Sequence, residues 1–261
     1  MKNNLNQSTL IVLAHPEPRS FNGKWAQASA EASQASGHTV LFSDLVSMGF
    51  DPVEKRSHYE FVPDGGSKDA FDPLRMQDEA AKGDRLPAQV ATEIDKVRQA
   101  DRIIFHFPLW WFGPPAILKG WLERCLVHGA LHSSSQRFDS GMCADKKVLF
   151  CVSTGSTAME SSPAGKEGDV NMLLWPLAYT LRYLGCTVLQ PCLVHGVHGF
   201  HQGEAKTELE QRLEQSINNQ AQLISNFDDM PVMSFNRDDE FDDRGVLKPS
   251  ATSQTRFIHH N

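Results

Sequence analysis

The sequence has few of the features that mark secreted or membrane-spanning proteins. It contains only 5 cysteines in 261 residues, an odd number without any CxxC spacing. This pattern favours reduced thiols and a cytoplasmic location over a disulfide framework. The apolar run near the start covers only residues 10–14. It is too short for the core of a signal peptide or for a membrane span, so we expect neither.

An excess of positive charge is also missing. Lysine and arginine total 25 against 32 acidic residues, which gives a formal net charge of -7. A protein that binds nucleic acid through a basic face would show the opposite balance, so no nucleic-acid partner is expected. The chain has no GxGxxG, GxxxxGK[ST] or GxSxG motif. The usual dinucleotide fingerprint, the Walker A loop and the hydrolase elbow are therefore not supported.

Five apolar strand-like segments alternate with helical ones along the chain. The strands are expected at residues 9–14, 39–42, 102–107, 147–152 and 187–194. The helices are expected at 22–36, 87–100, 115–126, 171–184 and 203–227. This alternation predicts an α/β fold, a doubly wound five-stranded parallel sheet with helices on both faces. Residues 1–227 form the expected domain, 45–86 a lid or interface insertion after strand 2, and 228–261 a C-terminal arm.

The most informative segment is the aromatic loop that follows the third strand. Pro108 and Leu109 lead into Trp110, Trp111 and Phe112, and a glycine and two prolines precede the next helix. Loops normally carry polar residues, and open α/β sheets bind ligands at the carboxyl ends of their strands. The loop therefore predicts a site for a large planar ligand, with a flavin ring as the candidate. Burial of the loop under the 45–86 insertion is the alternative.

Two polar loops should meet the aromatic loop at the same sheet edge. The first runs from His15 to Asn22 and leads into a helix whose N-terminus could attract phosphate. The other, Ser153 to Ser156, offers small residues and hydroxyl groups after the fourth strand. In chain order, residues 15–22, the aromatic loop and residues 153–156 are called the first, second and third loops. Taken alone, the first loop is better explained as a capped turn without a ligand, and the residues of the third suit any sharp turn.

Three histidines near the fifth strand raise the question of a metal site. His195, His198 and His201 follow one another at three-residue intervals. Zinc sites use such clusters, but this glycine-rich segment is a poor candidate for a helix that would bring the rings together. Loop histidines are the expected reading, and no metal is predicted.

Taken in order, these segments resemble the NAD(P)H:quinone oxidoreductases of the flavodoxin-like superfamily, the DT-diaphorase group. The resemblance rests on LIVLAHPEPRSFN, FPLWWFGPPAILKGWLERC and STGS followed by GDVNMLLWPL, across roughly residues 9–200. It implies a flavodoxin-like fold, bound FAD with FMN as an option, a homodimer, and two-electron reduction of quinones by NAD(P)H. The flavin carries the hydride, so no catalytic side chain is expected.

The resemblance also assigns roles to particular residues. His132 and Trp111 would contact the substrate. Where the family has a tyrosine and a histidine after the third loop, this chain has Ser161 and Glu167, and the family often has glutamine where Trp110 stands. The implied cofactor-binding residues are His15, Ser20, Phe21, Asn22, Pro108, Leu109, Trp110, Trp111, Phe112, Ser153, Thr154, Gly155 and Ser156.

Two other functions fit the same loops. Some relatives of the family are ancillary subunits that regulate potassium-efflux transporters, and an interaction protein that only retains flavin would look alike. An azo- or nitroreductase would differ only in its electron acceptor. The sequence does not choose between NADH and NADPH.

Overall fold

A six-stranded parallel sheet lies at the centre of the molecule. The computed structural model describes residues 7–62 and 70–260. The strand order is β2-β1-β3-β4-β5, with β6 also paired to β4, which confirms the predicted doubly wound sheet. The strands are β1 (Ser8–Leu13), β2 (Thr39–Asp44), β3 (Arg102–Pro108), β4 (Lys147–Ser153), β5 (Thr187–Val188) and β6 (Cys192–Val194).

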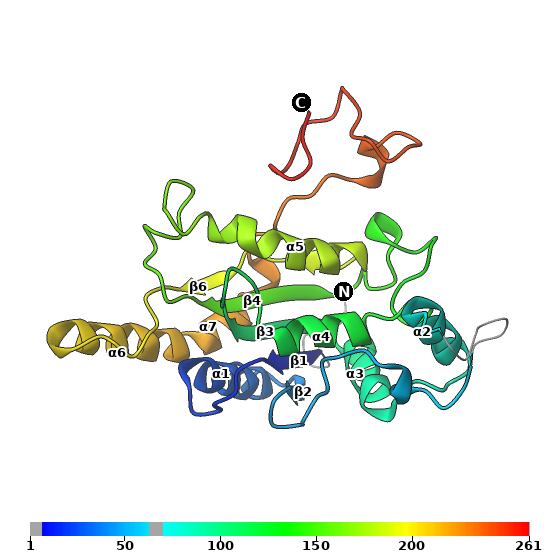
Figure 1. Ribbon diagram of the computed structural model, residues 1–261. Coiled ribbons are helices and arrows are strands. Elements are labelled where there is room, and N and C mark those ends of the chain that lie inside the picture. The colour runs from blue at the N-terminus through cyan, green and yellow to red at the C-terminus, as the bar shows by residue number, and fades with distance from the viewer. Residues whose placement is uncertain (1–6, 63–69, 261) are drawn as a thin grey trace.

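Helices cover both faces of this sheet (Figure 1). Helices α3 (Ala88–Gln99), α4 (Ala116–Cys125) and α5 (Val170–Tyr183) share one apolar core with alternate strand residues such as Phe105 and Phe150. Helices α1 (Phe21–Ala35) and α7 (Gln220–Ser225) share the other core, and α6 (Gly203–Asn218) lies beside α1. Because the central strands are buried on both faces, their sequences read as continuous apolar runs.

Two predicted elements prove to be divided. The fifth strand consists of β5 and β6, separated by Leu189, Gln190 and Pro191. Proline lacks the N–H that a continuous ladder requires, so the strand breaks there. The predicted helix 203–227 is interrupted at Asn219, which separates α6 from α7. The prediction of single elements was wrong at both places.

The insertion after β2 contains structure that the sequence pattern did not reveal. It holds a 3-10 turn at Arg56–His58 and helix α2 (Pro73–Lys82). Asp72 caps α2 by accepting a hydrogen bond from the Arg75 N–H at 3.2 Å. Met76 and Ala80 pack against Tyr59 in a small separate core. The part of the insertion at residues 63–69 lies outside the described residues.

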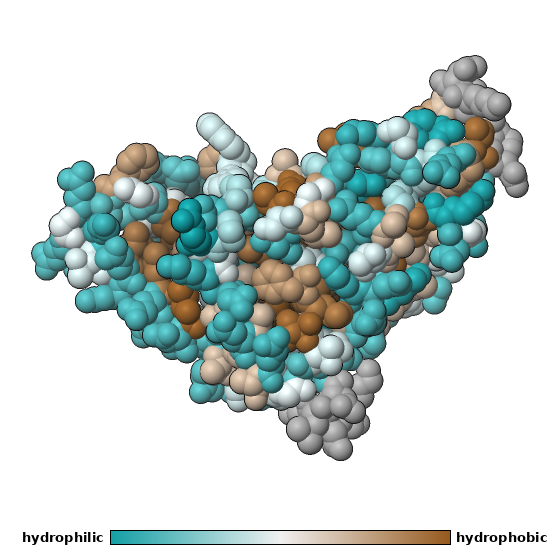
Figure 2. Space-filling view, turned by 90° about the horizontal axis from the view of Figure 1, so that it is seen from below, coloured by the Kyte–Doolittle hydropathy of each residue, from teal (hydrophilic) through white to brown (hydrophobic). Residues whose placement is uncertain are grey.

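The C-terminal arm leaves the sheet edge and passes beyond α5 (Figure 1). Val232 forms an isolated antiparallel bridge with Leu189, and the Phe257 ring stacks on Trp175 of α5 with centroids 4.4 Å apart. Within the described ranges, no helix is long and apolar enough to span a bilayer. The face of the molecule in Figure 2 is largely hydrophilic, with apolar side chains in separate patches.

Candidate active site

The three predicted loops meet at the carboxyl edge of the sheet. The Asn22 side chain donates a hydrogen bond to Ser153 Oγ at 2.8 Å and so joins the first loop to the third. The Leu109 N–H donates to the Ser153 carbonyl at 2.8 Å, which joins the second loop to the third. The rings of His15 and Trp110 lie 5.7 Å apart. The sheet therefore assembles one site from three segments spread over more than a hundred residues of the chain.

The aromatic loop is a tight turn with an unusual backbone. Trp110 and Gly113 exchange two backbone hydrogen bonds, at 2.9 and 3.1 Å. Between them, Trp111 and Phe112 both have positive φ, 50° and 63°. Non-glycine residues avoid this region, and the strain that results is characteristic of functional sites.

This turn holds its aromatic rings in solvent. Trp111 is 96% exposed, Phe112 55% and Trp110 45%. Burial under the 45–86 insertion is therefore excluded for the part of the insertion that the structure describes. Large exposed aromatic side chains held together in this way mark a binding surface.

The start of α1 provides polar groups beside the turn. Ser20 caps the helix by accepting a bond from the Gly23 N–H at 3.2 Å. The Phe21 ring stacks on Trp25 and belongs to the core, so the first-turn N–H groups are what this segment can offer a ligand. The Asn22 Oδ1 atom is buried without a hydrogen-bond partner. Such an atom is costly unless something binds it, so it points to a donor that a ligand supplies.

The third loop is tied to the segment after β6. The Thr154 hydroxyl donates to the Ser156 carbonyl at 2.9 Å, and His195 Nδ1 lies 2.9 Å from the same hydroxyl oxygen. Because that hydroxyl is already donating, the imidazole donates to it. Burial, reinforced by the nearby Arg212 cation, lowers the pKa of His195. The neutral His195 ring thus holds the Thr154 side chain in place through this hydrogen bond.

The two positions where this chain departs from the resemblance have different surroundings. Ser161 is buried, and its Oγ lies 2.6 Å from Ser156 Oγ. It therefore supports the third loop. Glu167 is half-buried, and the neighbouring Lys166 pairs with Glu160 at 3.5 Å.

Two hollows lie on either side of the aromatic turn. The first has a volume of about 460 Å³, within the range of about 300–1,000 Å³ typical of ligand sites. The second, of about 680 Å³, is an apolar groove between α4 and α5 that includes Phe112 and His132. The first hollow is lined by Pro108, Leu109, Trp110, Trp111, Ser153, Thr154, Gly155 and Val197.

Helix α4, which follows the turn, is fixed by buried polar contacts. Trp121 is 1% exposed, and its indole N–H donates to Glu93 Oε2 at 2.9 Å. Glu93 is fully buried and pairs with Lys96 at 2.7 Å. Trp121 thus packs in the core, unlike the tryptophans of the turn.

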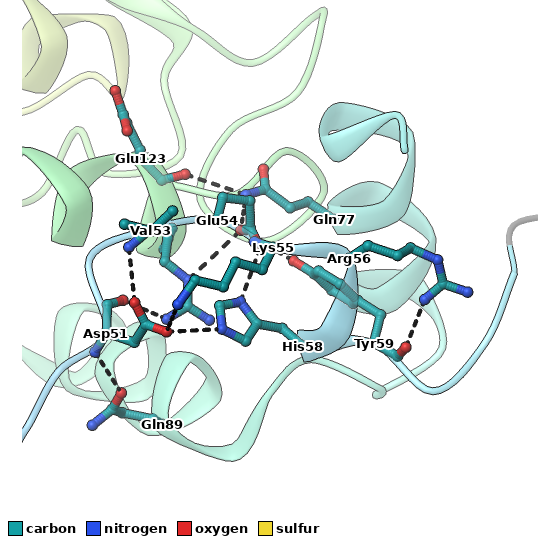
Figure 3. A network of polar contacts seen from close by, with 11 residues as sticks. Asp51, Val53, Glu54, Lys55, Arg56, His58, Tyr59, Gln77, Gln89 and Glu123 are labelled. Atoms are coloured by element: carbon teal, nitrogen blue, oxygen red, sulfur yellow. Dashed lines mark hydrogen bonds and ion pairs between the residues drawn. The ribbon is translucent and has the colours of Figure 1, made fainter. Parts of the chain in front are cut away.

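A second network binds α4 to the insertion (Figure 3). Arg124 donates to the Asp51 carbonyl at 2.6 Å, and its Nε lies 3.7 Å from Glu54 Oε2. Glu54 also accepts bonds from Tyr59 at 3.2 Å and Gln77 at 2.8 Å. The insertion therefore packs against the C-terminal end of α4, away from the aromatic turn.

The three histidines do not converge. His195 contacts Thr154, while the rings of His198 and His201 stack 3.9 Å apart and His201 Nε2 lies 2.9 Å from the Gly196 carbonyl. Across residues 7–62 and 70–260 no cluster of three or more His, Cys, Asp or Glu residues is arranged to hold a metal ion. The contact of His195 with the third loop was missed, because sequence spacing does not show which strand end lies beside which loop.

Comparison with known proteins agrees with this architecture. A family model described as the flavodoxin-like fold matches residues 7–217. NAD(P)H dehydrogenase (quinone) 1 of Cavia porcellus is 39% identical over 203 residues, 77% of this chain and 72% of the relative. Human ribosyldihydronicotinamide dehydrogenase (quinone) is 38% identical over 186 residues, 71% of this chain and 80% of the relative. The solved structure of a proposed quinone reductase from Klebsiella pneumoniae has a TM-score of 0.81 and 26% identity, covering 95% of this chain and 96% of that one.

Proposed function

Because this chain belongs to the flavodoxin-fold family of NAD(P)H dehydrogenases (quinone), we propose that it reduces quinones by two electrons with a bound flavin. The observation that carries the proposal is the meeting of the exposed aromatic turn with two polar loops at one sheet edge. When bound at this edge, a flavin would supply the hydride chemistry between NAD(P)H and the quinone, and the three loops would hold and orient it.

The residues at this edge fit a flavin. The buried Asn22 Oδ1 lacks a donor, and the α1 N-terminus beside it suits a phosphate. His15 Nδ1 is engaged with the Glu17 backbone at 3.0 Å, which leaves Nε2 for a ligand. We propose FAD, on the family resemblance, and FMN remains the form to be distinguished from it.

Each loop would contribute a different property. Trp110, Trp111 and Phe112 would bind the planar ring system. Exposed Gly155, where a Cβ would meet nothing within 4 Å, leaves room for close approach to the backbone of the third loop. N–H groups in that loop would stabilise negative charge on the reduced ring. His15, Ser20, Phe21, Asn22, Pro108, Leu109, Ser153, Thr154 and Ser156 complete the proposed cofactor site.

The nicotinamide and the quinone would occupy the same place in turn, which gives ping-pong kinetics. Trp111 would lie against the acceptor, and His132 would contact it from the adjoining groove. Burial of the His132 ring lowers its pKa, so this histidine is neutral near pH 7 and acts by packing and hydrogen bonding. The protein's contribution is orientation and exclusion of water.

We also propose a homodimer. The groove between α4 and α5 is apolar, and a second copy seated there would complete the acceptor side of the site. A cytoplasmic location is proposed because all five cysteines are free thiols in the structure.

The spectrum of the purified protein tests the proposal. We expect yellow protein that releases FAD on denaturation, identified by its mass. Release of FMN would revise the cofactor but keep the function. A colourless protein that takes up neither FAD nor FMN would overturn the proposal.

A further inference from the structure

Two cysteines lie opposite each other on neighbouring strands next to the candidate site. Cys151 of β4 is in register with Cys192 of β6. The two thiols are hydrogen-bonded. Cys151 is completely buried, whereas Cys192 is half-buried on β6, which pairs with β4. Both pack in the core on the α1 side of the sheet, on the opposite face from the groove between α4 and α5.

The environment makes the two sulfur atoms different. The hydrogen bond from the Cys151 thiol lowers the pKa of Cys192, while burial raises the pKa of Cys151. The thiolate is the nucleophile of cysteine chemistry, and its reactivity also depends on access. Cys192 therefore has the properties of an attacking thiol, and Cys151 those of a resolving thiol beside it.

We propose that Cys151 and Cys192 are a redox-active dithiol, which hydrogen peroxide converts reversibly to a disulfide. In the first step the Cys192 thiolate attacks one peroxide oxygen, the O–O bond breaks, and the leaving hydroxide takes a proton to become water. Cys192 is then a sulfenic acid. Cys151 attacks its sulfur, the S–S bond forms, and the sulfenic oxygen leaves with the Cys151 proton as a second water. Two thiols lose two electrons, and one peroxide gains them.

Strand geometry makes this disulfide possible and easily reduced. Neighbouring strands lie about 4.8 Å apart, at the short end of the Cα separations of about 4.4–6.8 Å that disulfides span. A disulfide between Cys151 and Cys192 can therefore form. Because most disulfides have Cα atoms about 5.5–6 Å apart, it would push β4 and β6 apart. Strained disulfides are the labile ones, so thiol reductants should reverse the oxidation.

The same geometry couples the dithiol to the third loop. Two residues beyond the cysteines, Ser153 is in register with Val194, and the Thr154 N–H donates to the Val194 carbonyl at 2.9 Å. A change in the spacing of β4 and β6 would therefore displace the loop that holds the flavin. This coupling rests on the proposed function, whereas the dithiol itself does not.

A second thiol pair provides a matched control. Cys143 and Cys186 are also hydrogen-bonded to each other, but both are buried, at 1% and 3% exposure. Peroxide should reach them more slowly than it reaches Cys192. Comparing the two pairs thus shows whether oxidation depends on peroxide access to the thiol or only on two thiols lying close together.

The experiment is thiol counting and peptide mapping of the purified full-length protein after limited peroxide treatment. We expect the loss of two thiols out of five, one disulfide-linked peptide pair containing Cys151 and Cys192, and full recovery with dithiothreitol. Cys143→Ser should leave this unchanged. Cys192→Ser should abolish it, and Cys151→Ser should leave a sulfenic acid on Cys192 that dimedone labels.

Several outcomes would overturn the proposal. These are a disulfide that joins Cys143 to Cys186, a disulfide between molecules, or direct overoxidation of Cys192 without a linked pair.

The coupling to the third loop is tested by FAD binding. The dissociation constant of FAD should rise about tenfold in the oxidised protein, equivalent to about 1.4 kcal/mol. A linked pair with unchanged FAD affinity would overturn the coupling, and failure to bind FAD in either state would count against the proposed function instead.

Discussion

At the scale of single residues, two tryptophans near α4 have opposite roles. Trp111 is 96% exposed in a strained turn, whereas Trp121 is 1% exposed and donates to a buried carboxylate. A buried aromatic side chain such as Trp121 stabilises the fold, whereas an exposed one that lines a hollow, such as Trp111, is available to bind a ligand. The same residue type therefore packs the core at position 121, whereas at position 111 we propose that it binds the ligand.

Replacing each tryptophan with alanine should separate these roles. Trp121→Ala should lower the free energy of unfolding by about 3–5 kcal/mol, because it removes a buried aromatic ring. Trp111→Ala should change it by less than about 0.5 kcal/mol, as is usual for an exposed side chain, yet weaken flavin retention. Urea unfolding and flavin release measure the two effects. A stable, flavin-free Trp121 variant would show that the turn has been misassigned.

A buried histidine makes stability depend on pH. Burial lowers the pKa of His106 to about 3 from an ordinary value of 6.5, and its Nε2 lies 3.0 Å from Ser29 Oγ. The unfolded chain thus binds a proton that the native chain excludes. The contribution of His106 to the free energy of unfolding is fully present above about pH 6.5. It decreases by about 1.4 kcal/mol per pH unit as the pH falls toward 3.

The test compares the natural protein with His106→Gln, whose amide can still donate to Ser29. Urea unfolding at several values between pH 4 and pH 6.5 should give a steeper loss for the natural protein. Because the other titrating groups are common to both, they cancel in the difference. Parallel pH profiles would contradict the assignment.

At the scale of elements, the insertion is secured to α4 by a buried cation. The Arg124 side chain is 2% exposed, donates to the Asp51 carbonyl and lies within 3.7 Å of the Glu54 carboxylate. A Cβ on Gly120 would lie 2.2 Å from the Pro52 carbonyl, so only glycine allows the insertion to lie this close. Because the network is buried, removing one partner would leave an uncompensated charge in the interior and lower the free energy of unfolding.

Arg124→Met should therefore lower the free energy of unfolding by about 3 kcal/mol, since Glu54 would lose its cation. Lys119→Met is the control on the same helix. Its pair with Glu123 is more than half exposed on both sides, and such pairs contribute about 0–1 kcal/mol. Chemical denaturation of both variants measures the difference. Equal losses would show that burial of Arg124 contributes nothing.

The sequence predicted the elements better than their ends. Continuous apolar runs located four strands, because a strand buried on both faces cannot carry polar residues. It did not show the break between β5 and β6, although Pro191 was a signal. Helix α2 was also readable from Asp72 and Pro73, a cap and a first-turn proline, but the polar composition of the insertion obscured it.

The candidate site was predictable only in part. Loop position after each strand placed Asn22, Trp110 and Ser153 together, since parallel strands end at one edge. The positive φ of Trp111 and Phe112 was not predictable, because local preference opposes it and the surrounding fold imposes it. The contact of His195 with Thr154 depends on strand order, which sequence spacing does not encode.

At the scale of the whole molecule, the groove between α4 and α5 should be the homodimer interface. Thr180 is exposed on its rim, and its hydroxyl donates to the Pro176 carbonyl at 2.8 Å. Thr180→Arg should place a charge in the apolar contact and shift the protein from twice the 29.1 kDa chain mass to a monomer.

The matched control is Thr207→Arg, which alters an exposed threonine of α6 with the same type of backbone hydrogen bond. It should remain dimeric. Light scattering at micromolar concentration gives both masses. A natural protein that is monomeric and fully active, or a Thr180 variant that stays dimeric, would contradict the assigned interface.

The central claim is that one flavin at the three-loop edge carries two electrons from NAD(P)H to a quinone. The visible absorbance of the purified protein, followed without oxygen, tests it most directly. One equivalent of NADPH or NADH should bleach the flavin, and one equivalent of benzoquinone should then restore the original spectrum. A flavin that neither nicotinamide bleaches, or a bleached flavin that quinone does not reoxidise, would contradict the account.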